Sequence, residues 1–277
     1  MKQISKTKKT GIIRKFFIKI ARLLGYELID QADLSFVTSS KENPTAIGEK
    51  TITLPLGEVK ITRKIQSLDL IIKTCTSVNL VTQNKKRIFE EKKSEYTFRT
   101  INSLLKALKY AQNNMNSVKF NITVVDTGSP TEDLNKINSM LKDSLFNYQL
   151  ISLDLKDYVN RIKIIKKNNS QIENNMKSTM ASIIKSFELS KDSDDLVYFV
   201  EDDYIHKIDS ISEMLFTYEK FSTVFKDELF IIPVDYPYLY QKNHSSNLLI
   251  GQNYHWRTVN ESLLTFLTSK IMINKYY

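Results

Sequence analysis

The pattern of apolar and polar positions changes near residue 67 and divides the chain in two. From there to the end, short apolar runs rich in β-branched and aromatic side chains alternate with segments of helical period. The runs predict strands at 68–76, 120–126, 148–155, 196–200 and 228–237, and residues 262–273 predict a strand that runs into a helix. The helical segments lie at 97–112, 131–144, 175–190 and 210–221. This order predicts an α/β fold, a mainly parallel sheet flanked by helices.

Cap signals accompany two of these helices. Thr131 stands where the N-cap of the helix at 131–144 is expected. Ser210 and Glu213 have the spacing of a capping box at the start of the helix at 210–221.

The first 66 residues have a different pattern. Residues 12–24, IIRKFFIKIARLL, place apolar side chains on one arc of a helix and basic side chains opposite, with Ile18 as the exception. A short hairpin or edge arm is predicted at 51–62, where Pro55 and Gly57 mark the turn. We therefore expect an N-terminal amphipathic helix and connector at 1–66 and one larger domain at 67–277.

Composition and charge limit the classes of protein that fit. The chain has 277 residues, 42% of them hydrophobic, and it contains no apolar run of about 18 residues that would predict a membrane span. One cysteine, Cys75, excludes an internal disulfide framework and a cysteine zinc site and is typical of a reducing cytosol. The net charge of +9 invites nucleic acid or anionic membrane as a partner, but no nucleic-acid motif accompanies the dispersed lysines, so no nucleic-acid partner is expected.

The basic helix leaves two interpretations open. Residues 11–25 would lie on an anionic membrane surface through the Phe16, Phe17 and Ile20 side, which would make the protein peripheral at the inner face of the membrane. The alternative is a helix packed on its own domain or on a partner.

Polar groups follow three of the predicted strands. Thr74 to Thr76 end the first, Asp126 ends the second, and Glu201, Asp202 and Asp203 end the strand at 196–200. In open parallel sheets, ligands bind at the carboxyl ends of the strands. The convergence of these groups at one edge predicts a binding site there.

Three consecutive acids after a buried strand raise the question of what offsets their repulsion. Glu201 and Asp203 are two residues apart, so both carboxylates can point to one side and share a Mn²⁺ or Mg²⁺ ion. The simpler interpretation is a solvated acidic turn. Asp126, in VVDTGS, has two interpretations as well: it either accepts from a nucleobase N–H or a ribose hydroxyl, or opens the turn at Gly128.

The sequence VVDTGS, followed about 75 residues later by VYFVEDD, resembles GT-A glycosyltransferases, in particular the inverting family 2 enzymes. The resemblance covers roughly residues 67–277. It implies a GT-A-like, Rossmann-like fold and a nucleotide-sugar donor held by Thr74, Thr76 and Asp126. It further implies a divalent metal bridging the donor diphosphate to the three acids, with Glu201 and Asp203 as ligands and Asp202 beside the donor.

The chain departs from that family at two points. Its first acid is glutamate, and its third helix carries KSTMAS where many members have small residues with Arg-Asn, so we expect Lys177 to contact the donor phosphates instead. The resemblance places a catalytic base near the last helix, where no such acid is recognisable. Glu261 is the best base in the chain and Asp235 the second, and both are otherwise ordinary loop acids. We therefore expect the domain to be incomplete at its C-terminus and weak or inactive in transfer.

Aromatic side chains in the second half suit an acceptor site for sugar rings, although ordinary packing explains aromatics equally well. They are Tyr236, Tyr238, Tyr240, His255 and Trp256. The leading hypothesis is a metal-dependent enzyme that moves a sugar from a nucleoside diphosphate to a glycan or lipid-linked acceptor in polysaccharide or glycolipid synthesis. A nucleotidyltransferase is the related alternative, although residues 73–87 lack the glycine it would need. A non-catalytic membrane-surface module is the alternative from another class. Neither His206 nor His244 predicts a site on its own.

Overall fold

The computed structural model describes residues 12–26, 60–77, 92–163, 170–241 and 246–277. They belong to two compact units. One contains the sheet and comprises residues 59–242, 250–255 and 259–277, and the other comprises 1–58, 243–249 and 256–258. The predicted hairpin at 51–62 lies outside the described residues except for its last three, and so does His244.

The larger unit is built on a five-stranded sheet with the order β3-β2-β1-β4-β7. The parallel strands are β1 (Ser67–Thr74), β2 (Lys119–Asp126), β3 (Asn147–Ser152) and β4 (Leu196–Glu201), and β7 (Phe266–Ser269) runs antiparallel to β4. β1 and β4 lie inside the sheet, and their side chains are buried on both faces except where Asp69 and Glu201 are partly exposed. The predicted α/β class with a mainly parallel sheet is confirmed.

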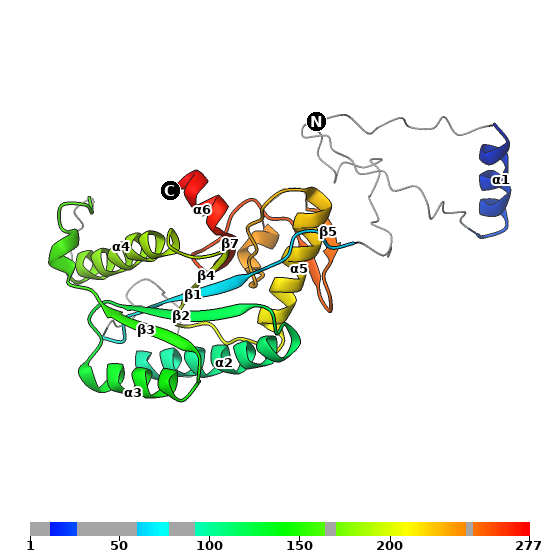
Figure 1. Cartoon of the computed structure of the whole chain (residues 1–277). Helices are drawn as coiled ribbons and strands as arrows, with labels where there is room; N and C mark the ends of the chain where they lie inside the picture. Colours follow the sequence, from blue (N-terminus) through cyan, green and yellow to red (C-terminus); the bar gives the residue numbers. More distant parts are fainter. Residues whose placement is uncertain (1–11, 27–59, 78–91, 164–169, 242–245) are drawn as a thin grey trace. The chain divides into compact units, whose positions relative to one another are not determined.

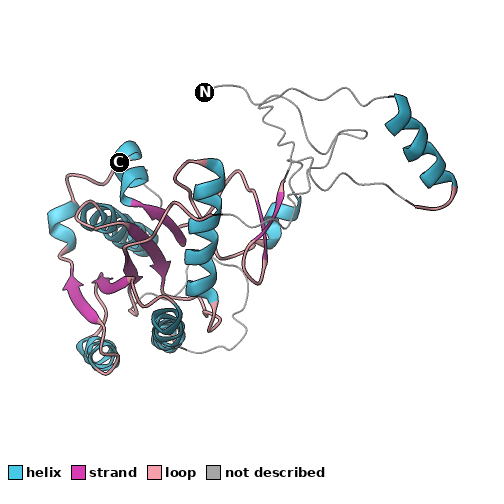
Figure 2. Ribbon diagram, turned by 45° about the vertical axis from the view of Figure 1, so that its right-hand side comes forward, coloured by secondary structure: helices cyan, strands magenta, loops and turns pink. Residues whose placement is uncertain are grey.

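Helices cover both faces of this sheet (Figure 1). On one side lies α4 (Ser170–Ser190), and on the other lie α2 (Lys93–Asn114) and α3 (Thr131–Lys142). The remaining helices of the unit are α5 (Ser210–Phe225), which packs on α2, and α6 (Lys270–Tyr276), which follows β7 (Figure 2). Short elements complete the described chain: η1 (Leu155–Tyr158), η2 (Pro237–Gln241), β5 (Leu248–Ile250) and β6 (His255–Arg257). The strands β5 and β6 pair in a separate small sheet.

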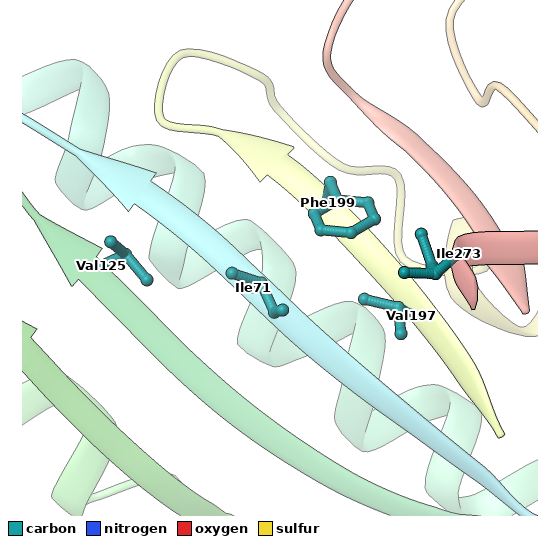
Figure 3. Packing of buried hydrophobic residues seen from close by; sticks show 5 residues of the cluster. All are labelled: Ile71, Val125, Val197, Phe199 and Ile273. Carbon is teal, nitrogen blue, oxygen red and sulfur yellow. The ribbon is translucent and has the colours of Figure 1, made fainter. Parts of the chain in front are cut away.

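The pleat of the strands decides which side chain meets which helix. Ile71, Val125, Val197 and Phe199 point to one side and pack with Ile273 of α6 (Figure 3). Phe187 of α4 packs against this cluster. Because successive side chains of a strand point to opposite faces, Lys73 and Glu201 continue the α4 side. Thr74 and Asp202 continue the side that carries α2.

Arg63 joins the segment before β1 to the sheet. Its guanidinium donates two hydrogen bonds to Asp195, just before β4, and its Nε lies 2.9 Å from Oε1 of Glu228, after α5. Both carboxylates raise the pKa of Arg63, and the hydrogen bond that Arg63 donates to Asp195 does so most strongly. Ile65 is buried two residues further on. Residues 60–66, which the sequence assigns to the connector, thus contact the sheet unit in the structure.

Three local expectations were wrong. The apolar run at 228–237 forms only an isolated bridge, between Ile231 and Leu267, because its two prolines cannot donate to a ladder. Pro130, not Thr131, is the N-cap of α3, and no side chain caps that helix.

The capping box at α5 is the third. Asp209 is the N-cap and makes no side-chain cap hydrogen bond. The Glu213 carboxylate is buried and instead accepts hydrogen bonds from the backbone N–H groups of Gln252 and Asn253, at 2.9 and 2.8 Å. Glu213 therefore fastens the loop between β5 and β6 to the first turn of α5.

The amphipathic helix predicted near the N-terminus is confirmed as α1 (Ile12–Leu23). Most of its large apolar side chains are exposed, from 41% for Ile20 to 87% for Ile12 and Leu23, and Ile18 is partly buried. Among the described residues, no helix is long and apolar enough to cross a membrane.

His206 should make the stability of the fold depend on pH. Its Nε2 is hydrogen-bonded to the buried Tyr198 hydroxyl, its Nδ1 is buried as well, and burial lowers its pKa from 6.5 to about 4. The unfolded chain therefore takes up a proton that the folded chain refuses between these two pH values. We expect the free energy of unfolding to fall by on the order of 3 kcal/mol as pH falls from about 6.5 to about 4.

Urea unfolding of the parent and of His206→Gln across this range measures the effect, since glutamine keeps a polar group near Tyr198 but does not titrate. The parent should lose more stability than the variant on acidification. His255→Gln, at an exposed position, is the matched control and should follow the parent. Parallel curves for the parent and His206→Gln would contradict the assignment.

Candidate active site at the carboxyl edge of the sheet

The middle acid of the triplet, Asp202, points into the protein. Its carboxylate accepts hydrogen bonds from Lys93 Nζ at 2.5 Å and from Thr97 Oγ1 at 2.7 Å, both on α2. The backbone N–H of Cys75, just after β1, lies 3.4 Å from the same carboxylate. Asp202 is 8% exposed, so this pair is shielded from solvent. The residue therefore fixes the acidic loop to α2 and β1.

Glu201 lies on the other face, beside a buried lysine. Lys73 Nζ is 3.7 Å from Glu201 Oε1, with side-chain exposures of 10% and 30%. Burial lowers the pKa of Lys73, and the attraction of Glu201 opposes this shift. Burial also raises the pKa of Glu201, and the lysine opposes that shift in turn. Desolvation thus outweighs the mutual attraction at both groups.

Asp203 is exposed and stands beside two tyrosines. The hydroxyls of Tyr204 and Tyr236 lie 2.9 Å apart, and the pKa of each is raised by burial, with smaller contributions from Glu201 and Asp203. The hydrogen bond joins the loop after β4 to the segment before η2. This contact brings residues 235–240 to the acidic edge of the sheet.

The Asp126 carboxylate organises the turn after β2. It accepts from the Thr74 hydroxyl at 2.7 Å and from the backbone N–H groups of Gly128 and Ser129 at 3.1 and 2.9 Å. The Ser129 hydroxyl donates a further hydrogen bond to Asp126. Gly128 has a φ of 92°, which favours glycine. In the structure Asp126 has its turn-forming role, and its contact with a donor stays a prediction.

Thr76 is held in the same network. Its backbone N–H donates to Ser129 Oγ at 2.9 Å, and its hydroxyl donates to Asp133 of α3 at 2.6 Å. The carboxyl ends of β1 and β2 are therefore locked together by side chains, in addition to their ladder.

The other predicted site residues lie further along the chain. Lys177 lies in α4 and is partly buried. Asp235 is exposed and accepts a hydrogen bond from the Tyr240 hydroxyl. Glu261 is exposed in the loop that precedes β7. The roles assigned to these three residues stay predictions.

The acids offer only part of the coordination shell that a metal ion requires. Within the described residues, no group of three or more His, Cys, Asp or Glu side chains is placed to hold an ion. Asp202 is engaged with Lys93, so the remaining candidates for oxygen ligands are the partly exposed Glu201, which is paired with Lys73 at 3.7 Å, and the exposed Asp203. Two carboxylates fit Mg²⁺ or Mn²⁺ if further oxygens come from a bound ligand or water. The donor set therefore suits a metal that binds together with a diphosphate.

Sequence reasoning missed Lys73, Lys93 and Thr97. A lysine inside an apolar strand was a signal for Lys73, since a charged side chain inside a sheet requires a partner. Nothing in the sequence connects Lys93 or Thr97 with Asp202, more than a hundred residues away.

Comparisons with known proteins give likenesses to solved structures only. No family model and no curated protein matches the chain. It is similar to S. aureus TarS 1-349, at 14% identity and a TM-score of 0.31, over 60% of this chain and 34% of that one. It is also similar to the galactosyltransferase LgtC in complex with donor and acceptor sugar analogues, at 13% identity and a TM-score of 0.28, over 50% and 39%.

The chain thus spans about a third of the length of the TarS chain that it matches. An active-site mutant of LgtC matches over 53% of this chain and 41% of its own, at a TM-score of 0.31. Likenesses of this size add nothing to the chemistry of the edge described above.

Substitutions of the adjacent acids Asp202 and Asp203 should differ sharply in their effect on the free energy of unfolding. Asp202→Asn leaves the partly buried Lys93 ammonium without its counter-charge, and we expect a loss of about 2–4 kcal/mol in the free energy of unfolding. Asp203→Asn changes an exposed side chain, and we expect a change within about 0.5 kcal/mol. Urea denaturation at pH 7 measures both. Equal losses for the two variants would refute the distinction between an anchored, buried Asp202 and a solvent-exposed Asp203.

Proposed function

We propose that this chain is a GT-A-like glycosyltransferase that binds a nucleoside-diphosphate sugar at the carboxyl edge of its sheet. The observation that carries the proposal is the division of the acids: Asp202 is anchored inside, while Glu201 and Asp203 stay towards solvent. They lie at the end of β4, which pairs with β1, at the carboxyl edge where open α/β sheets bind ligands.

In this proposal the chain's own residues prepare the site for an anionic leaving group. A Mn²⁺ or Mg²⁺ ion, when bound, would offset the negative charge that develops on the departing diphosphate. Glu201 and Asp203 would supply carboxylate oxygens to that ion, and Lys93 would keep Asp202 and the loop backbone in place. The turns at Thr74–Thr76 and at Asp126 would bound the nucleotide, and Lys177 remains the proposed phosphate contact.

The acceptor would approach from the segment joined to the acidic loop through Tyr204 and Tyr236. Tyr238, beside Tyr236 with their ring centroids 5.8 Å apart, is exposed and offers an aromatic ring to a sugar. The proposed general base remains Glu261, with Asp235 as the second candidate. Either carboxylate would accept the proton of the acceptor hydroxyl as that oxygen attacks the sugar.

Calorimetric titration with UDP tests the donor site. With Mn²⁺ present, UDP should bind the parent, and Asp203→Ala should weaken binding at least about tenfold, the loss of one charged contact. Asp194→Ala, an exposed acid just before β4 and so at the amino end of the same strand, is the matched control and should bind like the parent. Equal affinities in parent and Asp203→Ala would remove the metal bridge, and absence of UDP binding in the parent would remove the proposed function.

We propose, as a second activity of the same protein, that residues 11–25 bind an anionic membrane surface. The supporting observation is the exposure of Phe16, Phe17 and Ile20 on α1, together with Lys15 and Lys19, which are exposed as well. Buried apolar area and attraction to anionic lipid both contribute to such binding. This placement would bring the enzyme to a lipid-linked acceptor at the cytoplasmic face.

Co-sedimentation with vesicles of phosphatidylcholine and phosphatidylglycerol tests the membrane contact. Replacing Phe16 and Phe17 together by serine should reduce binding at least about tenfold at any salt concentration. The reason is that each of the two rings, once buried in the bilayer, contributes roughly 1.5–3 kcal/mol. Replacing Lys15 and Lys19 together by serine should weaken binding mainly at low salt.

Deletion of residues 1–25 should release the protein from the vesicles and leave UDP affinity unchanged. Loss of UDP binding or unfolding on deletion would instead make α1 a structural element.

A further inference from the structure

Lys73 is a buried cation beside Glu201, one of the two proposed metal ligands, and the proposed reaction gives it no role. It lies in the central strand β1 and is 8% exposed, and the register pairs it directly with Glu201 of β4. Its ammonium is 3.7 Å from Glu201 Oε1. Mostly apolar side chains from α4, β4 and the β7 region line the small pocket that it borders: Ile183, Ser186, Phe187, Phe199, Leu264 and Phe266.

We propose that Lys73 is the internal counter-cation of Glu201 and Asp203. Its ammonium competes with a divalent metal for Glu201 and contacts the diphosphate of a bound nucleotide. The inference rests on the proposed function, because it concerns the same edge of the sheet. It adds a positioning residue that acts on the metal through Glu201 and on the donor directly.

Competition with the metal follows from charge and burial. A divalent ion at Glu201 would sit close to the Lys73 ammonium, which is 3.7 Å from Glu201 Oε1 and belongs to a side chain that is 10% exposed. Like charges repel more strongly there than at an exposed position, because fewer water molecules screen them. The metal alone therefore binds weakly while Lys73 keeps its charge.

The same charge favours a diphosphate. A nucleotide whose phosphates reach Glu201 through a metal places anionic oxygens close to the Lys73 ammonium, which is a point-charge phosphate ligand. Without metal, the phosphates still meet this ammonium at the edge of the sheet. Lys73 thus opposes one ligand of the site and assists the other.

Lys93 cannot take this role in the described structure. Its ammonium is 2.5 Å from Asp202 Oδ1, on the α2 side of the sheet. Lys73 and Lys93 therefore pair with different acids on different faces of the sheet, and of these two Lys73 is the one on the side of Glu201.

Two titrations of Lys73→Met, an apolar residue of similar length, test the proposal through effects of opposite sign. Mn²⁺ alone, followed by the electron paramagnetic resonance of the free ion, should bind about tenfold more tightly than to the parent. UDP in the presence of EDTA, followed by calorimetry, should bind about fivefold more weakly. A general loss of structure cannot produce this pair of results, because it would weaken both ligands.

Lys64→Met is the matched control. Lys64 also lies 3.7 Å from a glutamate, Glu219, but its side chain is 63% exposed and it precedes β1 at the other end of the strand. Both affinities of this variant should stay within about twofold of the parent. Lys73→Arg keeps the charge and should restore most of the parental behaviour in both titrations.

Unchanged or weaker Mn²⁺ binding in Lys73→Met, with a parental circular dichroism spectrum and melting temperature, would overturn the competition. Unchanged UDP binding would overturn the phosphate contact. Lys73→Gln carries the same expectations if Lys73→Met does not fold. A parent that binds no UDP would refute the proposed function and the phosphate contact together. The competition would then be decided separately, because the Mn²⁺ titrations of the parent and of the Lys73→Met and Lys64→Met variants need no nucleotide.

Discussion

The ion pair of Asp202 and Lys93 is the interaction on which the acidic edge depends. It holds the acidic loop against α2, and the hydroxyl of Thr97 completes the contact. The alternation of side chains along the strand then determines the side on which each neighbour of Asp202 lies. Glu201 must lie on the α4 side, and Asp203, at the start of the loop, faces solvent. One buried carboxylate thus separates three consecutive acids that would otherwise repel one another.

Many polar side chains at this edge form hydrogen bonds with one another and hold the ends of the strands together. Asp126 receives hydrogen bonds from Thr74, Gly128 and Ser129, and Thr76 bonds to Asp133 of α3. Buried polar groups have to be satisfied in this way, since an unpaired one costs as much as a lost hydrogen bond. The result is a rigid rim that joins the ends of β1 and β2, against which the partly exposed Glu201 and the exposed Asp203 stand out.

The fold was largely predictable from the sequence, and the contacts of the site were not. Periodicity located the strands and helices of the sheet and the strand-to-helix junction at Ser269–Lys270, because burial on both faces leaves a clear apolar signal. It failed at 228–237, where composition favoured a strand but Pro233 and Pro237 removed donors from the ladder. Glu213 likewise matched a local cap pattern but serves a loop some 40 residues later. Partners so distant in the chain, such as Lys93 for Asp202, follow only from the packing of helices on the sheet.

Charge balance explains why such a site would prefer two ligands to one. The ammonium groups of Lys73 and Lys93 offset two of the three acidic charges, so little net charge remains to attract a metal ion alone. In the proposed function, a nucleoside diphosphate alone would meet the acids as well as the lysines. A metal and a diphosphate that bind together would neutralise each other, and each would then find an opposite charge in the protein. Lys73 and Lys93 would therefore favour joint binding of both ligands, a form of coupling that requires no movement of the fold.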